Sequence, residues 1–274
     1  MAAGSLDHMS HAQLLDIARS TAVTAGALAH RRRTEGVSVA DHKSSPVDVV
    51  TLADRETELL IRSLLADARP HDGFLGEEGG AERGTSGLTW VVDPIDGTVN
   101  YLYGIAHWAV SIAVVEGEPE PRSWHALAGC VTNPVTGEIY TATDSGGAFS
   151  GNQQLRVAEP ASMAQSLIGT GFSYDSGRRA QQGAVVAGLL PLVRDIRRFG
   201  AASLDLCAVA TGRLNGYFER GLSPWDHAAG ALIAREAGAT VEGRDGGAPD
   251  ADWLLAAPRE LHGSLARHLV DLGA

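Results

Sequence analysis

The 274-residue sequence predicts a mixed α/β protein, in which an α+β half is joined to an α/β half. Two observations predict this class. Short apolar runs that are typical of buried strands follow one another in the middle of the chain. From about residue 156 onwards, strand-like segments alternate with helical ones, as they do when helices cover a sheet. We therefore expect residues 1–155 and 156–274 to form two halves, with a catalytic cleft between them.

The first half is expected to begin with two helices and to continue as a sheet. Apolar residues recur at helical spacing from His11 to Arg33 and again from Thr51 to Ala68. We expect residues 1–8 to be an added leader, with Met9 as the natural start. Buried strands are expected at Leu88–Val92, Trp108–Val115, Ala126–Val131 and Glu138–Ala142.

Strands and helices alternate along the second half. Strands are expected at Ser166–Gly171, Gly216–Glu219 and Trp253–Ala256. Helices are expected at Arg178–Leu190, Ser203–Ala210, Asp226–Ala237 and Arg259–Leu272. This alternation is the reason for expecting α/β layers after residue 155.

Composition excludes several classes of protein. Hydrophobic residues make up 44% and charged residues 20%, which rules out a disordered, collagen-like or coiled-coil chain. With 22 Lys and Arg against 33 Asp and Glu, the formal net charge is −11, so we do not expect nucleic acid as a partner. No apolar run has the length of a membrane span, no signal peptide is seen, and the two cysteines lack metal-ligand spacing, which together predict a cytoplasmic protein. If the substrate is an anion, something other than net charge must attract it.

The segment Trp90 to Asn100 carries the sharpest chemical signal. An apolar strand runs directly into Asp93 and Asp96, and the ring of Pro94 between them restricts how far the two carboxylates can diverge. Both carboxylates, and the carbonyl of Ile95 between them, could bind a hard cation. Gly97 allows a ligand to approach the backbone, and a helix that opens near Thr98 would direct N–H groups at a phosphate. The alternative is a strand-end turn in which Asp96 is only a helix N-cap.

Other acids lie in similar surroundings, and each has a plain alternative explanation. Glu77 lies in the glycine-framed loop 76–79, which could be a solvated turn, and Glu219 ends an apolar strand. Asp226 precedes a helix that it could cap, and Asp54 forms a capping-box pattern with the threonine three residues earlier. Gathered carboxylates repel one another unless cations neutralise them. Since no His or Cys cluster accompanies these acids, the sequence indicates Mg²⁺, with Mn²⁺ as a substitute, rather than Zn²⁺.

Four segments resemble, in order, the signatures of the inositol monophosphatase family. They are Asp48-Val-Val-Thr-Leu-Ala-Asp54, Gly76-Glu-Glu78, Asp93-Pro-Ile-Asp-Gly-Thr-Val-Asn100 and Trp225-Asp-His-Ala-Ala-Gly230. The stretch Arg197–Cys207 resembles the bacterial inositol-1-phosphatase branch of the family. The resemblance implies a layered αβαβα sandwich of the sugar-phosphatase type. It also implies a homodimer that hydrolyses phosphate monoesters with Mg²⁺ and is inhibited by lithium.

The resemblance also implies a role for each matching residue. A first metal would be held by Glu77, Asp93 and the Ile95 carbonyl, and a second by Asp93, Asp96 and Asp226. A third, looser ion would contact Glu77 and waters. Asp54 and Thr98 would orient the attacking water. Phosphate or substrate hydroxyls would meet Asp96, Gly97, Thr98, the backbone at Ala202, Glu219 and Asp226.

The expected reaction is the hydrolysis of a small polyol or sugar phosphate by metal-activated water, with myo-inositol 1-phosphate as the first candidate substrate. Histidinol phosphate, fructose 1,6-bisphosphate and 3′-phosphoadenosine 5′-phosphate remain alternatives, because Glu219 could accept a hydrogen bond from several leaving groups. A regulatory protein that works through a partner is a further alternative from another class. It is less favoured, because such a protein could lose metal ligands and this sequence keeps every one of them.

Overall fold

The computed structural model of the chain describes residues 9–37, 39–42, 49–159 and 161–274. The leader expected at residues 1–8 and Asp48 of the first motif lie outside the described residues. Among the described residues, none of the helices combines the length and the apolar character that crossing a bilayer requires.

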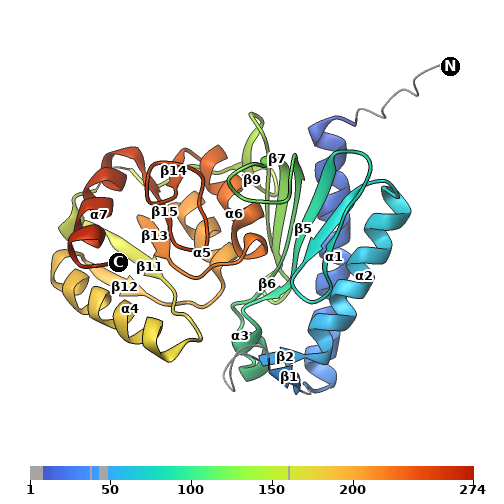
Figure 1. The fold of residues 1–274 in the computed structure, drawn as a ribbon, viewed down its shortest axis with the longest axis horizontal. Helices are drawn as coiled ribbons and strands as arrows, with labels where there is room; N and C mark the ends of the chain where they lie inside the picture. Colours follow the sequence, from blue (N-terminus) through green and yellow to red (C-terminus); the bar gives the residue numbers. More distant parts are fainter. Residues whose placement is uncertain (1–8, 38, 43–48, 160) are drawn as a thin grey trace.

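An eight-stranded sheet occupies one side of the molecule, and helices α1 (His11–Glu35) and α2 (Leu52–Ala68) cover its outer face (Figure 1). The strand order is β10-β9-β8-β7-β6-β5-β3-β4, and β3 with β5 is the parallel pair in an otherwise antiparallel sheet. A short ribbon of β1 (Val39–His42) and β2 (Val49–Thr51) leads into α2. The strands of the large sheet are β3 (Gly73–Gly76), β4 (Gly80–Glu82), β5 (Leu88–Asp96), β6 (Ala109–Glu116), β7 (His125–Asn133), β8 (Glu138–Thr143), β9 (Gly147–Ser150) and β10 (Gln153–Gln154).

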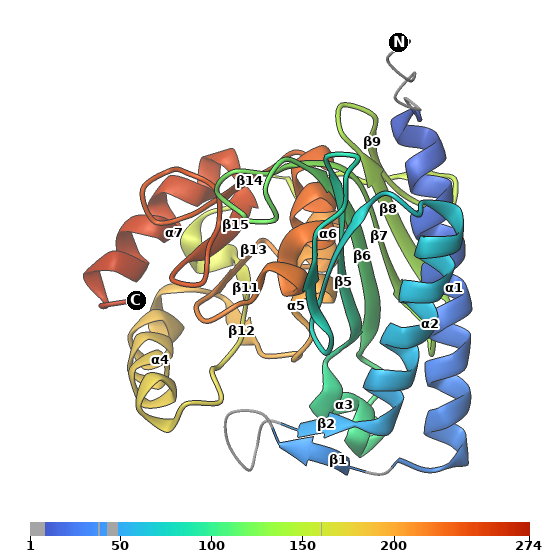
Figure 2. The same cartoon turned by 45° about the vertical axis from the view of Figure 1, so that its right-hand side comes forward.

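A five-stranded sheet of order β12-β11-β13-β15-β14 forms the other side. Helices α5 (Ala202–Ala210) and α6 (Pro224–Glu236) lie between the two sheets, and α4 (Ser176–Leu189) and α7 (Arg259–Asp271) cover the far face (Figures 1 and 2). The remaining elements are β11 (Leu167–Thr170), β12 (Asp195–Arg197), β13 (Gly216–Glu219), β14 (Ala239–Glu242), β15 (Leu254–Pro258), the short helix α3 (Thr98–Tyr103), and 3₁₀ turns at Met163–Gln165 and Leu190–Leu192.

Alternation of side chains along the strands explains why both faces of each sheet are buried. On β5, Trp90 and Val92 join the cluster beneath α1 and α2, whereas Val91 joins the cluster beneath α5 and α6. On β13, Tyr217 packs with the α5–α6 layer, and Phe218 packs with α4 and α7. Apolar clusters are therefore packed between successive layers, which follow one another in the order αβαβα (Figure 2). The fold class expected from the sequence is confirmed.

The structure departs from the sequence prediction mainly where strands are short. The hairpin of β3 and β4 and the edge strand β14 are not revealed by periodicity, because three or four residues provide too little pattern. Strand β5 continues to Asp96, beyond the expected end at Val92, and α6 begins at Pro224 rather than Asp226. The large sheet ends at Gln154, but the division into halves near residue 155 stays a prediction.

Candidate active site

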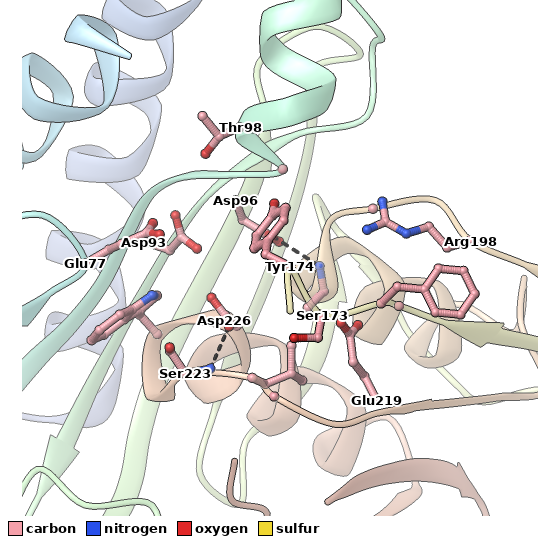
Figure 3. A pocket seen from close by; sticks show the side chains of 18 of the residues that line it. Glu77, Asp93, Asp96, Thr98, Ser173, Tyr174, Arg198, Glu219, Ser223 and Asp226 are labelled. Carbon is pink, nitrogen blue, oxygen red and sulfur yellow. Dashed lines mark hydrogen bonds between the residues drawn. The ribbon is translucent and has the colours of Figure 1, made fainter. Parts of the chain in front are cut away.

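One cavity of about 430 Å³ is lined by residues of both sheets and of the helices between them. Figure 3 shows the acids pointing into this space, with Glu77 next to Asp93 and with Glu219 on the opposite side. The cavity is lined by nine of the ten residues that the sequence singled out, namely Glu77, Asp93, Ile95, Asp96, Gly97, Thr98, Ala202, Glu219 and Asp226. The tenth, Asp54, lies behind Thr98 and is hydrogen-bonded to it.

A β-bulge explains how Asp93 and Asp96 reach the same cavity. Two residues three apart in a regular strand point to opposite faces. Here Asp93 pairs with Ser111 and Asp96 with Ala109, so β5 holds one residue more than β6 over this interval. The extra residue brings the second carboxylate round to the face of the first. Pro94, which has no N–H to donate, is accommodated in this irregular stretch of strand.

The carboxylate of Asp96 caps the helix α5 of the opposite half of the chain. It accepts backbone N–H groups of Ala202 at 3.2 Å and Ser203 at 2.8 Å, and the Ser203 hydroxyl at 2.5 Å. Ala201, the N-cap residue of α5, provides no side-chain cap of its own. The cap expected of Asp96 is therefore real, but it serves a distant helix, because α3 has Gly97 as its own N-cap. The Ala202 N–H, expected at substrate hydroxyls, is held by Asp96 in this structure.

Gly97 is required by its backbone conformation. Its φ of 91° lies in the left-handed region, and a Cβ atom there would come within 3.1 Å of the Gly200 carbonyl oxygen and 3.2 Å of the His107 carbonyl oxygen. This tight turn lets α3 begin directly after the second aspartate, with Thr98 at its first position. The carboxylates of Asp93 and Asp96 and the N-terminus of α3 are thus brought to the cavity wall by one short segment of the chain.

Asp54 and Thr98 form a hydrogen-bonded pair at the cavity wall, in which Thr98 lines the cavity and Asp54 is buried behind it. The Thr98 hydroxyl lies 3.2 Å from Asp54 Oδ1 and 3.1 Å from the Ile95 carbonyl oxygen. Asp54 Oδ2 accepts the backbone N–H of Thr51 at 2.8 Å and its hydroxyl at 2.5 Å, so the capping box expected at the start of α2 is present. Burial raises the pKa of Asp54 to about 6, although these donors oppose the rise.

Asp226 also belongs to a capping box, but at the third position of its helix rather than at the N-cap. Ser223 is the N-cap of α6, Pro224 starts the helix, and Asp226 at its third position accepts the Ser223 N–H at 2.7 Å. The hydrogen bond orients one carboxylate oxygen and leaves the side chain at the cavity wall. The alternative that Asp226 is only the N-cap is therefore not what the structure has, because Ser223 takes that position.

Glu219 lies at the end of β13 on the far side of the cavity from Glu77 (Figure 3). The Tyr217 hydroxyl donates to its Oε2, which fixes the carboxylate. Burial raises the pKa of Glu219 to about 7, while the Tyr217 hydrogen bond lowers it. Glu219 can thus both accept and, when protonated, donate a hydrogen bond near neutral pH.

Burial and mutual repulsion together raise the pKa values of the acids in the cavity. Burial first, then the charges of Glu77, Asp96 and Asp226, raise the pKa of Asp93 well above its usual value. The pKa values of Asp96 and Asp226 are raised too, again with burial as the largest cause. Glu77 is the first of these charges, so a proton or a cation between the Glu77 and Asp93 carboxylates would relieve their repulsion.

The donor set fits a hard divalent cation. All of the side-chain donors are carboxylates, and a backbone carbonyl lies between two of them, which is the oxygen chemistry that Mg²⁺ and Mn²⁺ prefer. Within the described ranges, no three acidic, histidine or cysteine side chains are arranged so that they could hold an ion as they stand. The fit therefore rests on donor chemistry and on the repulsion that a cation would remove.

We expect Mg²⁺ or Mn²⁺ to stabilise the protein more at high pH than at low pH. The raised pKa values mean that these acids bind protons more tightly in the metal-free fold than in the unfolded chain. Their contribution to stability is therefore fully present below about pH 4 and is lost as pH rises through the raised values. A cation replaces those protons. Thermal unfolding with and without Mn²⁺ should show a larger rise in melting temperature at about pH 8 than at about pH 5.5. An equal rise at both would contradict the carboxylate cluster as the binding site.

Two residues that the motifs did not reveal belong to the site's structure. Ser203 holds Asp96, and Tyr217 holds Glu219. The sequence signal for Ser203 is its place in the Arg197–Cys207 stretch at the start of a helix, and for Tyr217 it is the place two residues before Glu219 on the same strand. Neither signal is specific without the fold, since the contact of Ser203 with Asp96 joins residues more than a hundred positions apart.

Comparison with known proteins identifies the family. The inositol monophosphatase family model matches residues 10–274. An inositol-1-monophosphatase of Mycobacterium leprae is 45% identical over 249 residues, which cover 84% of this chain and 83% of the relative. A Vibrio cholerae protein named Nus factor SuhB is 39% identical over 203 residues, 73% of each chain. The solved structure of Mycobacterium tuberculosis SuhB is 38% identical with a TM-score of 0.81, covering 97% of this chain and 99% of that one.

The fold and these relatives define a phosphatase, a hydrolase of phosphate monoesters. The chain belongs to the inositol monophosphatase family, and the family resemblance drawn from the four ordered motifs is confirmed.

Proposed function

We propose that this protein hydrolyses small polyol and sugar phosphate monoesters with Mg²⁺ as cofactor, and that myo-inositol 1-phosphate is its preferred substrate. The observation that carries the proposal is the gathering of the motif acids around one cavity, next to the start of α3 and opposite Glu219. The inositol-1-monophosphatase name of the Mycobacterium leprae relative supports the substrate.

Each residue then has a task in the reaction. Cations bound by Glu77, Asp93, the Ile95 carbonyl, Asp96 and Asp226 would supply positive charge to the phosphate and lower the pKa of a nearby water, which an acidic protein cannot do alone. The N–H groups of Gly97 and Thr98 would donate to phosphate oxygens as α3 begins.

Asp54 and Thr98 would orient the attacking water and accept its proton. The Thr98 hydroxyl can orient the water as it donates to Asp54, and an ionised Asp54 can accept the proton through it. Burial holds this carboxylate in place, so the pair is oriented before substrate arrives. No serine, cysteine or histidine nucleophile is required.

Glu219 is expected to recognise hydroxyl groups of the leaving group. Glu219→Gln should reduce kcat/KM for inositol 1-phosphate by about tenfold, because a charge-assisted hydrogen bond to a ring hydroxyl is lost. The rate with p-nitrophenyl phosphate, whose leaving group carries no hydroxyl, should change by less than about twofold. Steady-state kinetics on both esters test this, and an equal loss on both would contradict hydroxyl recognition.

Phosphate release from four esters, with and without Mg²⁺, tests the function itself. The esters are inositol 1-phosphate, histidinol phosphate, fructose 1,6-bisphosphate and 3′-phosphoadenosine 5′-phosphate. We expect Mg²⁺-dependent turnover that is fastest with the inositol ester. Preference for another ester would overturn the substrate, and no turnover of any ester would favour the partner-binding alternative that the name of the Vibrio cholerae relative suggests.

Lithium inhibition, homodimeric assembly and a cytoplasmic location complete the proposal, and their support is the family resemblance. Lithium should inhibit turnover at saturating Mg²⁺ in the same assay. Light scattering after gel filtration should give about twice the chain mass of 28.6 kDa.

A further inference from the structure

Helix α2 carries a second buried acid one turn after Asp54. Glu58 is 3% exposed, and its Oε2 accepts the backbone N–H of Glu78 at 2.8 Å. Its other oxygen lies 3.7 Å from a guanidinium nitrogen of Arg62. The reaction described above gives Glu58 no task, although its carboxylate enters the turn that carries Glu77.

The glycines of the turn make room for this carboxylate. A Cβ atom on Gly76 would lie 2.5 Å from Glu58 Oε2, and one on Gly79 would lie 2.6 Å from Glu58 Oε1 and 2.8 Å from an Arg62 nitrogen. Only glycine at both positions lets the carboxylate sit inside the turn. The glycine frame of loop 76–79 therefore has a physical reason, which is the approach of a side chain from α2.

Arg62 ties the same hairpin to α2 at two further points. Its guanidinium lies 4.0 Å from the ring centroid of Phe74 on β3 and 2.9 Å from Glu82 Oε2 on β4. Glu58 and Arg62 thus hold the turn and both strands of the β3–β4 hairpin against the helix. Asp54, on the same helix, holds Thr98 on the other side of the cavity.

We propose that Glu58 is a positioning residue, which fixes the Glu77 turn and thereby sets the affinity of the cavity for divalent cations. Groups that orient metal ligands typically change metal affinity 10- to 100-fold when they are removed. The proposal rests on the proposed function, because it takes Glu77 as a metal ligand.

Isothermal titration of the full chain with Mn²⁺ tests the proposal. Glu58→Leu removes the acceptor for the Glu78 N–H and should weaken Mn²⁺ binding about tenfold or more. Glu58→Gln keeps an acceptor oxygen but not the charge, and it should stay within about threefold of the unsubstituted protein. Ile61→Ala is the matched control: Ile61 is fully buried on the same helix, so the change lowers stability without touching the turn.

The outcomes separate the possible explanations. Unchanged Mn²⁺ affinity in Glu58→Leu would overturn the positioning role. If Glu58→Gln weakened Mn²⁺ binding as much as Glu58→Leu does, the role would also be overturned, because the charge of Glu58 alone would then explain the effect. Equal weakening in Ile61→Ala would overturn it by showing a general stability effect. If Glu58→Leu does not fold, Gly79→Ala replaces it in the test. This variant keeps every proposed ligand, crowds the Glu58 carboxylate and should weaken Mn²⁺ binding by a similar factor. Unchanged Mn²⁺ affinity in Gly79→Ala would overturn the positioning role. No Mn²⁺ binding by the unsubstituted protein would overturn the proposed metal site as well.

Discussion

Asp93→Asn is expected to reduce phosphate release by about 10²–10³-fold or more, because it removes the carboxylate that the proposed function assigns to both metals. The substitution should not destabilise the metal-free protein. Asp93 is 2% exposed among repelling acids, and an amide oxygen can still accept the Ile95 N–H, which lies 3.0 Å from Oδ1. The metal-free variant should therefore melt at the same temperature as the unsubstituted protein or a few degrees higher, while Mn²⁺ should no longer raise its melting temperature.

Asp72→Asn is the matched control for this change. Asp72 is another buried aspartate, but it binds the Arg69 guanidinium and the Trp90 indole N–H, each at 3.0 Å, and it does not line the cavity. Its replacement should destabilise the protein by about 1–3 kcal/mol and leave kcat nearly unchanged. If Asp93→Asn instead destabilised the metal-free protein as Asp72→Asn does, and Mn²⁺ still raised its melting temperature, the metal-ligand role would be wrong.

The expected changes in stability of Asp93→Asn and Asp72→Asn have opposite signs because the two aspartates have different surroundings. A buried acid that pairs with cations or donors stabilises the fold, whereas acids gathered together destabilise it until a cation arrives. The pKa values of Asp93, Asp96 and Asp226 are raised by burial first and then by the charges of neighbouring acids. The same acids would allow a chain of net charge −11 to bind a phosphate, because the cations that they hold present positive charge where the protein itself has little.

Much of the fold could be predicted from the sequence, because long periodic segments dominate it. Helices α1, α2 and α7 and the buried strands β6 and β7 show enough period or apolar length to be found alone. The β3–β4 hairpin could not be found in that way. Its two glycine-rich strands are held by Glu58 and Arg62 of α2, and sequence alone does not place that helix beside the hairpin.

The site residues were predictable as a set, but their local geometry was not. Local patterns and the family resemblance together singled out all ten. The structure gathers nine around one cavity with Asp54 behind it, and their roles stay predictions. The bulge in β5 could not be deduced, because register depends on the partner strand. The capping of α5 by Asp96 depends on the docking of two distant segments.

Asp54→Asn is expected to lower kcat by about 10²–10⁴-fold while the affinity for Mn²⁺ stays within a few-fold of normal, because Asp54 is assigned to the proton and not to the metals. An amide cannot accept the proton that the Thr98 hydroxyl relays, and if its NH₂ group faces Thr98, the Thr98–Asp54 hydrogen bond is reversed or lost. Glu56→Gln on the same helix is the control, since Glu56 lies at the surface with Arg32 and should not affect kcat.

Combining Asp54→Asn with Thr98→Val distinguishes a proton-handling pair from two separate contributions. If the two side chains act as one unit, the double variant should be about as slow as Asp54→Asn alone, because neither group works without the other. Effects that multiply would mean that Thr98 binds substrate independently of Asp54. Loss of Mn²⁺ affinity in Asp54→Asn would show instead that the carboxylate is needed for the metal site, and the assignment of the proton to this pair would then be wrong.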